Sequence, residues 1–134
     1  MFYTALASKK CMELCDAAFG KTHHLNNREN AIRHGLWNIL IIKRLTTAKI
    51  QLDKAVAWSK TITDWHERFA VNASLECAMD LHNNAIGRMV YSQVSELTEL
   101  DILNYLKDKA QQAICVSSIK EINPNVVEFV FINE

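Results

Sequence analysis

The sequence predicts a mainly α-helical fold, a compact bundle of about five helices with a short C-terminal β hairpin or edge strand. Three glycines and one proline in 134 residues favour long helices with few tight turns. Apolar residues recur with helical spacing through residues 1–114, whereas residues 115–134 are β-rich. A chain of this length fits one domain, so we expect residues 1–134 to share a single core.

The first predicted helix covers residues 2–19. Its apolar residues are spaced for one face, and Gly20 is well placed to end the helix. Residues 21–25 are predicted to form a loop. The adjacent His23 and His24 are therefore expected at the surface, and we assign them no role.

A second helix is predicted over residues 27–45 from its cap and its hydrophobicity. Asn26 can cap it, and Glu29 completes a pattern like a capping box. Apolar residues cover most of its circumference, which is typical of a buried central helix. Arg33 and His34 belong to this helix, so we expect them to enter the interior with it.

The third helix is predicted over about residues 47–69, and the fourth begins after a cap at Asn72 or Ser74. The third helix carries a stripe with helical spacing, in which the single lysine can bury its stem and keep its amine in water. The stripe consists of Ile50, Lys54, Trp58, Ile62, Trp65 and Phe69.

Residues 98–101 resemble a capping box and predict a fifth helix that runs to about Ala113. The chain then becomes β-rich in residues 116–122 and 126–132, and residues 123–125 (Asn-Pro-Asn) are a turn signal between them. This pattern predicts the C-terminal hairpin or edge strand.

The charge balance gives no signal for nucleic acid or for an acidic membrane surface, because fifteen Lys and Arg residues offset fifteen Asp and Glu residues. The start of the chain has no apolar stretch of signal-peptide length, and no run approaches the roughly 20 residues of a membrane helix. We therefore expect a cytoplasmic protein, unless it is exported without a cleavable signal or is part of a longer secreted chain. Four scattered cysteines fit free thiols in a reducing compartment.

The fourth predicted helix carries polar residues where a core helix would carry Leu and Ile. Asp and Asn are poor interior helix formers, and Gly87 adds roughly 1 kcal/mol of cost relative to Ala. Either this face makes a close helix-packing contact through Gly87, or it forms a functional site. The residues that share the face are Glu76, Asp80, Asn83, Asn84, Gly87 and Tyr91.

Three of the predicted helices can bring acid, base and amide groups together. We expect His34 or His66 to act as general base or metal ligand, while Glu67 and Asp80 orient a histidine or bind metal. The alternative is that His34 has a structural role, in which its buried ring only forms a hydrogen bond with a neighbouring group. The residues expected to bind substrate, including an oxyanion or phosphate, are Arg33, Trp37, Asn83, Asn84 and Arg88.

A divalent metal is a candidate cofactor, although no motif in the sequence fixes it. His66-Glu67 lacks the second histidine of the zincin pattern His-Glu-x-x-His. His34, His66-Glu67 and Asp80 imitate the His, His-Asp, Asp spacing of metal-dependent phosphohydrolases, with Glu in place of Asp. The sequence contains no phosphate-binding loop, nucleophile elbow or dinucleotide fingerprint.

Three blocks of the sequence resemble an uncharacterised family of small bacterial domains. They are residues 30–38 (Asn-Ala-Ile-Arg-His-Gly-Leu-Trp-Asn), the pair His66-Glu67, and residues 79–88 (Met-Asp-Leu-His-Asn-Asn-Ala-Ile-Gly-Arg). Some members look like C-terminal modules of secreted or toxin-like proteins. The resemblance covers about residues 28–90 and implies that the polar residues of these blocks form one site. A toxin-like setting implies, by analogy alone, a hydrolase acting on phosphoester, lipid or cell-wall material.

A non-enzymatic binding or inhibitor protein is the alternative function. In that case the polar cluster only fixes helix packing. The apolar residues 126–132 would then form an exposed strand that joins a partner's sheet or a second copy of the chain.

Overall fold

The structure is a computed structural model that describes residues 2–69 and 74–132. It confirms the mainly helical fold with a small C-terminal β element. The elements are α1 (Phe2–Phe19), η1 (Thr22–His24), α2 (Arg28–Thr47), α3 (Leu52–Phe69), α4 (Ser74–Met89), α5 (Tyr91–Val94), α6 (Glu99–Ala110), β1 (Ile114–Val116), η2 (Ile119–Glu121) and β2 (Val130–Ile132).

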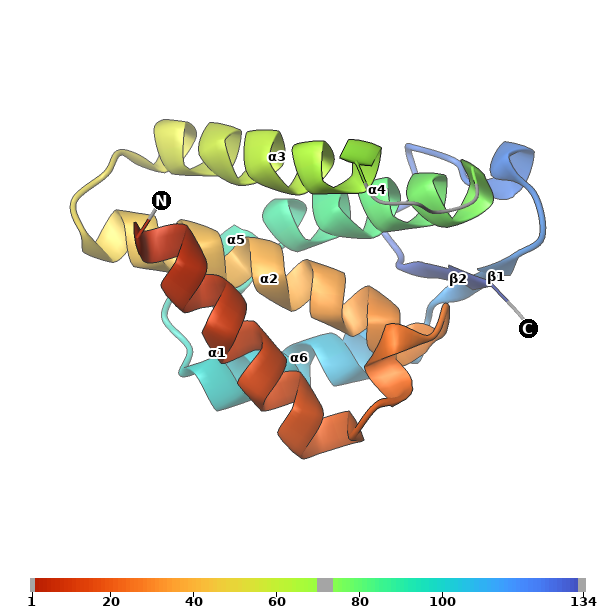
Figure 1. Cartoon of the computed structure of the whole chain (residues 1–134), viewed down its shortest axis with the longest axis horizontal. Coiled ribbons are helices and arrows are strands. Elements are labelled where there is room, and N and C mark those ends of the chain that lie inside the picture. Colours follow the sequence, from red (N-terminus) through yellow and green to blue (C-terminus); the bar gives the residue numbers. More distant parts are fainter. Residues whose placement is uncertain (1, 70–73, 133–134) are drawn as a thin grey trace.

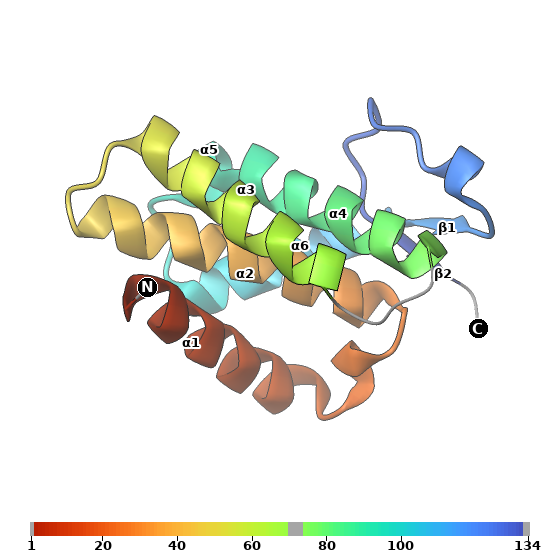
Figure 2. The same cartoon turned by 45° about the horizontal axis from the view of Figure 1, so that its top comes forward.

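The helix α2 lies at the centre of the fold, as its hydrophobicity predicts. It contacts α1, α3, α4 and α6, and more than half of its 20 residues are buried. Figure 1 shows α3 and α4 on one side of α2, with α1 and α6 on the other. The same arrangement is visible after a turn of the molecule (Figure 2). The side of α2 that faces α3 and α4 can therefore carry polar side chains. The side that faces α1 and α6 can carry apolar ones.

The helix ends follow local signals where the sequence supplies them. Gly20 has a φ of 62° directly after α1, and the Thr98 side chain accepts a hydrogen bond from the backbone N–H of Asp101 at the start of α6. The cap of α2 is Asn27, one residue after the predicted Asn26, and its side chain accepts from the N–H of Asn30. The predicted caps of α4 include Asn72, which lies outside the described residues, while Ser74 is the first described residue of that helix.

The boundary between α2 and α3 differs from the prediction, because α2 continues to Thr47 and α3 starts only at Leu52. The chain leaves α2 through a Schellman-type end: Lys49 has a φ of 71°, and the N–H of Ile50 donates to the carbonyl of Leu45. Glycine normally occupies the left-handed position at such a helix end. Because a lysine stands there instead, the sequence did not reveal where α2 ends.

The predicted stripe of α3 is not its buried face. Trp65 is 59% exposed and Ile50, which precedes the helix, is 41% exposed. The fully buried positions recur every four residues and are mostly polar, because this side of α3 packs against polar side chains of α2 and α4. They are Ala55, Ser59, Thr63 and Glu67.

The loop predicted for residues 21–25 instead contains the short helix η1, and the expectation that His23 is exposed is wrong. The His23 side chain is fully buried, whereas His24 is exposed as expected. The His23 Nε2 lies 2.7 Å from Asp16 Oδ1, so a carboxylate in the last turn of α1 holds the ring inside.

The C-terminal β element is confirmed, but its pairing is not that of a hairpin. β1 and β2 are parallel, with Ile114 opposite Val130 and Val116 opposite Ile132. A hairpin is antiparallel, whereas here the chain crosses back through η2 before β2 begins. The turn signal at residues 123–125 falls within that crossover, where the N–H of Val126 donates to the carbonyl of Asn123.

The segment expected to act as an exposed docking strand, residues 126–132, is largely part of the fold. Phe129 is fully buried in the main core, and Val130 is 2% exposed. The backbone N–H and C=O of Val130 bond to the Asn83 side chain, and the N–H of Ile132 donates to the carbonyl of Asn26. These backbone groups of β2 are therefore already occupied within the chain.

Among the helices of the described residues, none combines the length and the apolar character needed to cross a bilayer.

Candidate functional site

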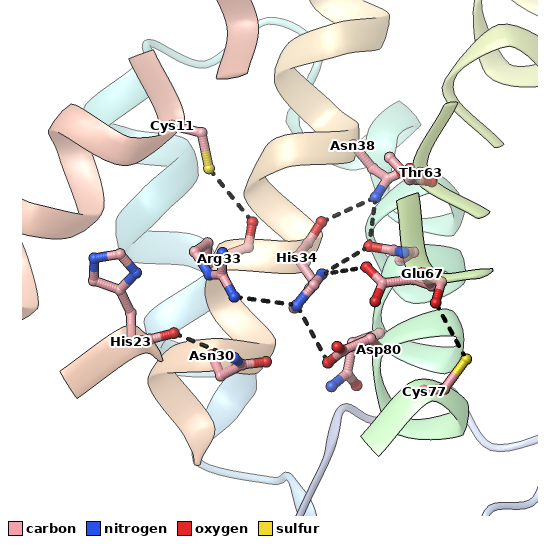
Figure 3. Close-up of polar contacts among 12 residues, drawn as sticks. Cys11, His23, Asn30, Arg33, His34, Asn38, Thr63, Glu67, Cys77 and Asp80 are labelled. Carbon is pink, nitrogen blue, oxygen red and sulfur yellow. Dashed lines mark hydrogen bonds and ion pairs between the residues drawn. The ribbon is translucent and has the colours of Figure 1, made fainter. Parts of the chain in front are cut away.

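A histidine and two carboxylates from three different helices meet in the interior. His34 of α2, Glu67 of α3 and Asp80 of α4 are all buried. The His34 Nδ1 lies 3.6 Å from Glu67 Oε1, and its Nε2 lies 3.2 Å from Asp80 Oδ1. One ligand atom from each residue lies within 4.8 Å of the other two. Figure 3 shows His34 between the two carboxyl groups. We call these three residues the central cluster.

The central cluster arises where three columns of i,i+4 positions face one another, because residues four apart stack on the same side of a helix. Each column supplies one charged or titratable residue and one or two smaller polar partners. The columns are His34 with Asn38 on α2, Asp80 with Asn84 on α4, and Ser59, Thr63 and Glu67 on α3.

A chain of hydrogen bonds leads from Arg88 to His34 and fixes the orientation of each amide on the way. The Arg88 guanidinium, which can only donate, lies 2.8 Å from Asn38 Oδ1. The Asn38 Nδ2 therefore faces the other way and donates to Asn84 Oδ1 at 2.9 Å and to the backbone carbonyl of His34 at 3.0 Å. Ser59 Oγ adds a second donor to Asn38 Oδ1 at 2.8 Å.

The same chain defines the tautomer of His34. Its Nδ1 lies 3.2 Å from Asn84 Oδ1, which is an acceptor, so Nδ1 carries the proton. The Nε2 atom then bears the lone pair and faces Asp80 Oδ1, with the Arg33 guanidinium 3.5 Å away. The network thus presents an unprotonated ring nitrogen to a carboxyl oxygen.

Burial keeps the His34 ring neutral. Desolvation lowers the pKa of His34 to about 3, and the positive charge of Arg33 acts in the same direction, while the bond to Asn84 opposes them. At neutral pH the ring is therefore neutral, and the lone pair on Nε2 can accept a hydrogen bond or bind a metal ion.

Asp80 responds to the same environment in the opposite direction. Burial, followed by the neighbouring carboxylate of Glu67, raises the pKa of Asp80 to about 8, although Arg33 opposes the shift. Without a cation, Asp80 thus holds a proton at neutral pH and can donate it to His34 Nε2. Two buried carboxyl groups side by side repel each other, so either a proton or a cation must separate their charges.

With both carboxyl groups ionised, four buried polar atoms around the central cluster lack a hydrogen bond within the described part of the chain. Two are acceptors, Glu67 Oε1 and Asp80 Oδ1, and two are donors, Arg33 Nε and Asn84 Nδ2. Buried polar atoms are rarely left unpaired. A cation suits the two oxygens, and an anionic or carbonyl oxygen suits the two donors.

A pocket of about 280 Å³ opens next to the central cluster and reaches His34. His66 and Trp37 form one wall, with their ring centroids 5.3 Å apart and edge to face. Arg33 lines the pocket as well, so its guanidinium borders both the pocket and the buried imidazole. The complete lining is Ser8, Cys11, Met12, Arg33, His34, Trp37 and His66. This volume is close to that of small-molecule sites.

Some of the sequence-predicted site residues point elsewhere. His66 is exposed and belongs to the pocket wall, outside the central cluster. The Asn83 amide is occupied by the backbone of Val130, with two bonds of 2.9 Å. Arg88 bonds to Asn38 and Thr63, so it supports the amide network from behind.

Sequence reasoning missed Ser59 and Thr63, which face Asn38 from α3. Their signal was the spacing of small or polar residues every four positions from Ala55 to Glu67. That spacing was hidden because the aromatic stripe of the same helix suggested a different buried face.

The fold and the central cluster define a small all-helical domain whose interior holds a histidine and two carboxyl groups. The family model for a domain of unknown function (DUF6973) matches residues 1–114, and the chain belongs to this family. The match confirms that the chain belongs to an uncharacterised domain family. Comparisons with curated proteins and with solved structures gave no match.

Proposed function

We propose that this domain is a hydrolase in which His34, Glu67 and Asp80 hold a divalent metal ion. The observation that carries the proposal is the meeting of these three side chains, from three helices, with ligand atoms within 4.8 Å of one another. An imidazole and two carboxylates are common ligands of zinc and related dications in hydrolytic sites.

The charges of the central cluster support this proposal. A neutral His34 and two ionised carboxylates carry a charge of minus two, which a dication neutralises. The lone pair of His34 Nε2 already faces Asp80 Oδ1 at 3.2 Å. A bound dication would replace the proton of Asp80, because metal ligands bind in their deprotonated form.

The pocket favours an anionic substrate. Arg33 is the cationic side chain of its lining, and the Arg33 Nε has no hydrogen-bond partner among the described residues. A guanidinium in this position suits a phosphate or another oxyanion, so we propose a phosphoester before a neutral lipid or cell-wall substrate. Trp37 offers an apolar surface for the organic part of such a molecule.

Each residue then has a role in the reaction. A bound dication would lower the pKa of a water molecule towards 7 and so supply hydroxide. Arg33 orients the phosphoryl group and stabilises the negative charge that grows on its oxygens. As water adds to phosphorus, the bond to the leaving oxygen breaks, and His66 on the pocket wall is placed to give that oxygen a proton.

The experiment is to measure metal content and phosphoester hydrolysis of the purified full chain with Mg²⁺, Mn²⁺ and Zn²⁺, using bis(p-nitrophenyl) phosphate and p-nitrophenyl phosphate. Glu67→Gln and Asp80→Asn should lose the metal equivalent bound at the central cluster and the activity together. Asp64→Asn changes a carboxylate one turn earlier in α3, where it pairs with Lys60, and should retain both.

Two results would overturn the proposal. One is a folded wild-type protein that binds none of these ions. The other is an activity that survives both Glu67→Gln and Asp80→Asn. The non-enzymatic alternative predicts a third pattern, in which the variants change stability alone and the wild type hydrolyses none of the substrates.

A further inference from the structure

A second group of metal-ligand side chains lies where α1 turns into η1. Asp16 belongs to the last turn of α1, and His23 and His24 end η1. One ligand atom from each of these residues lies within 4.8 Å of the others. None of the three belongs to the central cluster or lines its pocket, and the function proposed above leaves them without a role.

The buried ring of His23 is incompletely satisfied. Its Nε2 contacts Asp16 Oδ1 at 2.7 Å, but its Nδ1 is buried without a hydrogen-bond partner among the described residues. The Asp16 side chain is 46% exposed, so one side of this contact is open to solvent. The buried imidazole makes a single side-chain hydrogen bond, and the half-exposed Asp16 side chain lies between that ring nitrogen and solvent.

The geometry leaves room for an ion with a small adjustment. With bonds of about 2.0–2.1 Å, two tetrahedral ligand atoms are roughly 3.3 Å apart. Asp16 Oδ1 and His23 Nε2, now 2.7 Å apart, must therefore separate by about 0.6 Å, which the half-exposed Asp16 side chain permits. The His24 ring lies against the His23 ring, with centroids 4.1 Å apart, and supplies a third ligand on the exposed side.

The contact between His23 Nε2 and Asp16 Oδ1 is a hydrogen bond in the metal-free protein, so a metal ion bound by both atoms takes the place of the shared proton.

The nearby charges restrict the kind of ion. Asp16 is one carboxylate beside two imidazoles, and Lys21 stands at the start of η1, so the site is not an acidic one that attracts cations by charge alone. Binding must come from the affinity of imidazole nitrogen for the metal, which favours first-row transition ions over Mg²⁺ and Ca²⁺.

We infer that Asp16, His23 and His24 form a site for a transition-metal dication of the Zn²⁺ class, which fastens η1 to the end of α1 and leaves a coordination position for water. The site is independent of the central cluster. A metal ion can bind to Asp16, His23 and His24 whether or not one is bound at the central cluster.

The test uses site-resolved NMR and calorimetry on the full chain. Substoichiometric Cu²⁺ should broaden the backbone amide signals of residues 16–24 in the wild type and leave them sharp in His24→Ala, whose altered side chain is exposed. Titration with Zn²⁺ should show at least about a tenfold weaker affinity for His24→Ala and Asp16→Asn, since each loses one of three protein ligands.

Lys21→Ala is the matched control, because it changes the same turn without removing a ligand. It should bind Zn²⁺ as tightly as the wild type or more tightly, since it removes a positive charge. Sharp signals for residues 16–24 with Cu²⁺ in the wild type, or equal Zn²⁺ affinity in His24→Ala, would overturn the inference. Broadening around His34 reports on the central cluster separately, so failure of one site is distinguishable from failure of the other.

Discussion

Gly35 of α2 and Gly87 of α4 pack backbone against backbone. A Cβ atom placed on Gly87 would lie 2.6 Å from the Cα of Gly35 and 2.5 Å from its carbonyl oxygen. A Cβ on Gly35 would meet the ring of Phe129 at 2.8 Å. The sequence left open whether the face around Gly87 is a packing contact or a site, and the structure contains both a glycine contact and a polar cluster beside it.

We predict that Gly87→Ala is strongly destabilising. The atoms that a new methyl group meets are backbone atoms of a central helix, which cannot move as a side-chain tip does. Overpacking typically costs about 1–3 kcal/mol, and this site should reach or exceed the upper end of that range. The free energy of unfolding from urea denaturation measures the effect.

Gly20→Ala is the control for Gly87→Ala. Nothing lies within 4 Å of a Cβ built on Gly20, but its φ of 62° carries a strain of about 1 kcal/mol for alanine. If Gly87→Ala were no less stable than Gly20→Ala, the close contact between α2 and α4 would not be rigid.

The Asn83 side chain forms the two backbone hydrogen bonds to β2 that a neighbouring strand would otherwise form. Its removal should therefore destabilise β2. Its amide both donates to and accepts from the backbone of Val130, so Asn83→Ala leaves two buried groups unpaired. We expect a loss of about 2–4 kcal/mol and faster amide hydrogen exchange at Val130. Asn104→Ala, at an exposed position of α6, should change neither quantity. Unchanged protection at Val130 in Asn83→Ala would contradict this role.

The helix starts and ends that the sequence predicted well are those with a local signal. Gly20 and Thr98 act within their own turns, so neither depends on the rest of the fold. The end of α2 was misplaced because Lys49 takes the left-handed conformation that glycine usually marks. The parallel pairing of β1 and β2 depends on a crossover, which residue patterns within each strand do not encode.

The sequence indicated which residue types form the candidate site, but not which way each side chain points. His34, Glu67 and Asp80 were recognised because charged and titratable residues are costly inside a helix bundle. Asn83 and Asn84 are adjacent and looked equivalent, yet a rotation of about 100° between them sends one to β2 and the other to His34. Only the positions of the neighbouring elements distinguish the two.

We predict that His34 is neutral and carries its proton on Nδ1 in metal-free protein from pH 5 to pH 8. Because its pKa is about 3, the ring does not titrate in this pH range. The hydrogen bond to Asn84 Oδ1 selects the tautomer. Long-range ¹H–¹⁵N NMR of the ring distinguishes the two tautomers. In Asn84→Ala the selecting acceptor is gone, so a mixture of tautomers is expected. A proton on Nε2 in the wild type would contradict the proposed chain of hydrogen bonds from Arg88.

Asp80 should make metal-free protein less stable as the pH rises from 6.5 to 8. Its pKa of about 8 in the folded state exceeds its ordinary value of 3.8, so the folded state binds the proton more tightly. The resulting stabilisation is present at low pH and is lost as the pH rises from about 4 to about 8. For His34 the pKa falls from 6.5 to about 3, so its contribution is lost as the pH falls through that range.

Between about pH 4 and 6.5 these two contributions change in opposite directions and nearly cancel, whereas above pH 6.5 only that of Asp80 remains. We therefore expect the free energy of unfolding, measured with a chelator present, to fall by about 1–2 kcal/mol from pH 6.5 to pH 8. Asp80→Asn cannot ionise and should abolish this fall. A parallel pH dependence in the wild type and Asp80→Asn would mean that Asp80 is already ionised at pH 6.5. In that case a charge other than its own proton, such as Arg33, would stabilise the buried carboxylate.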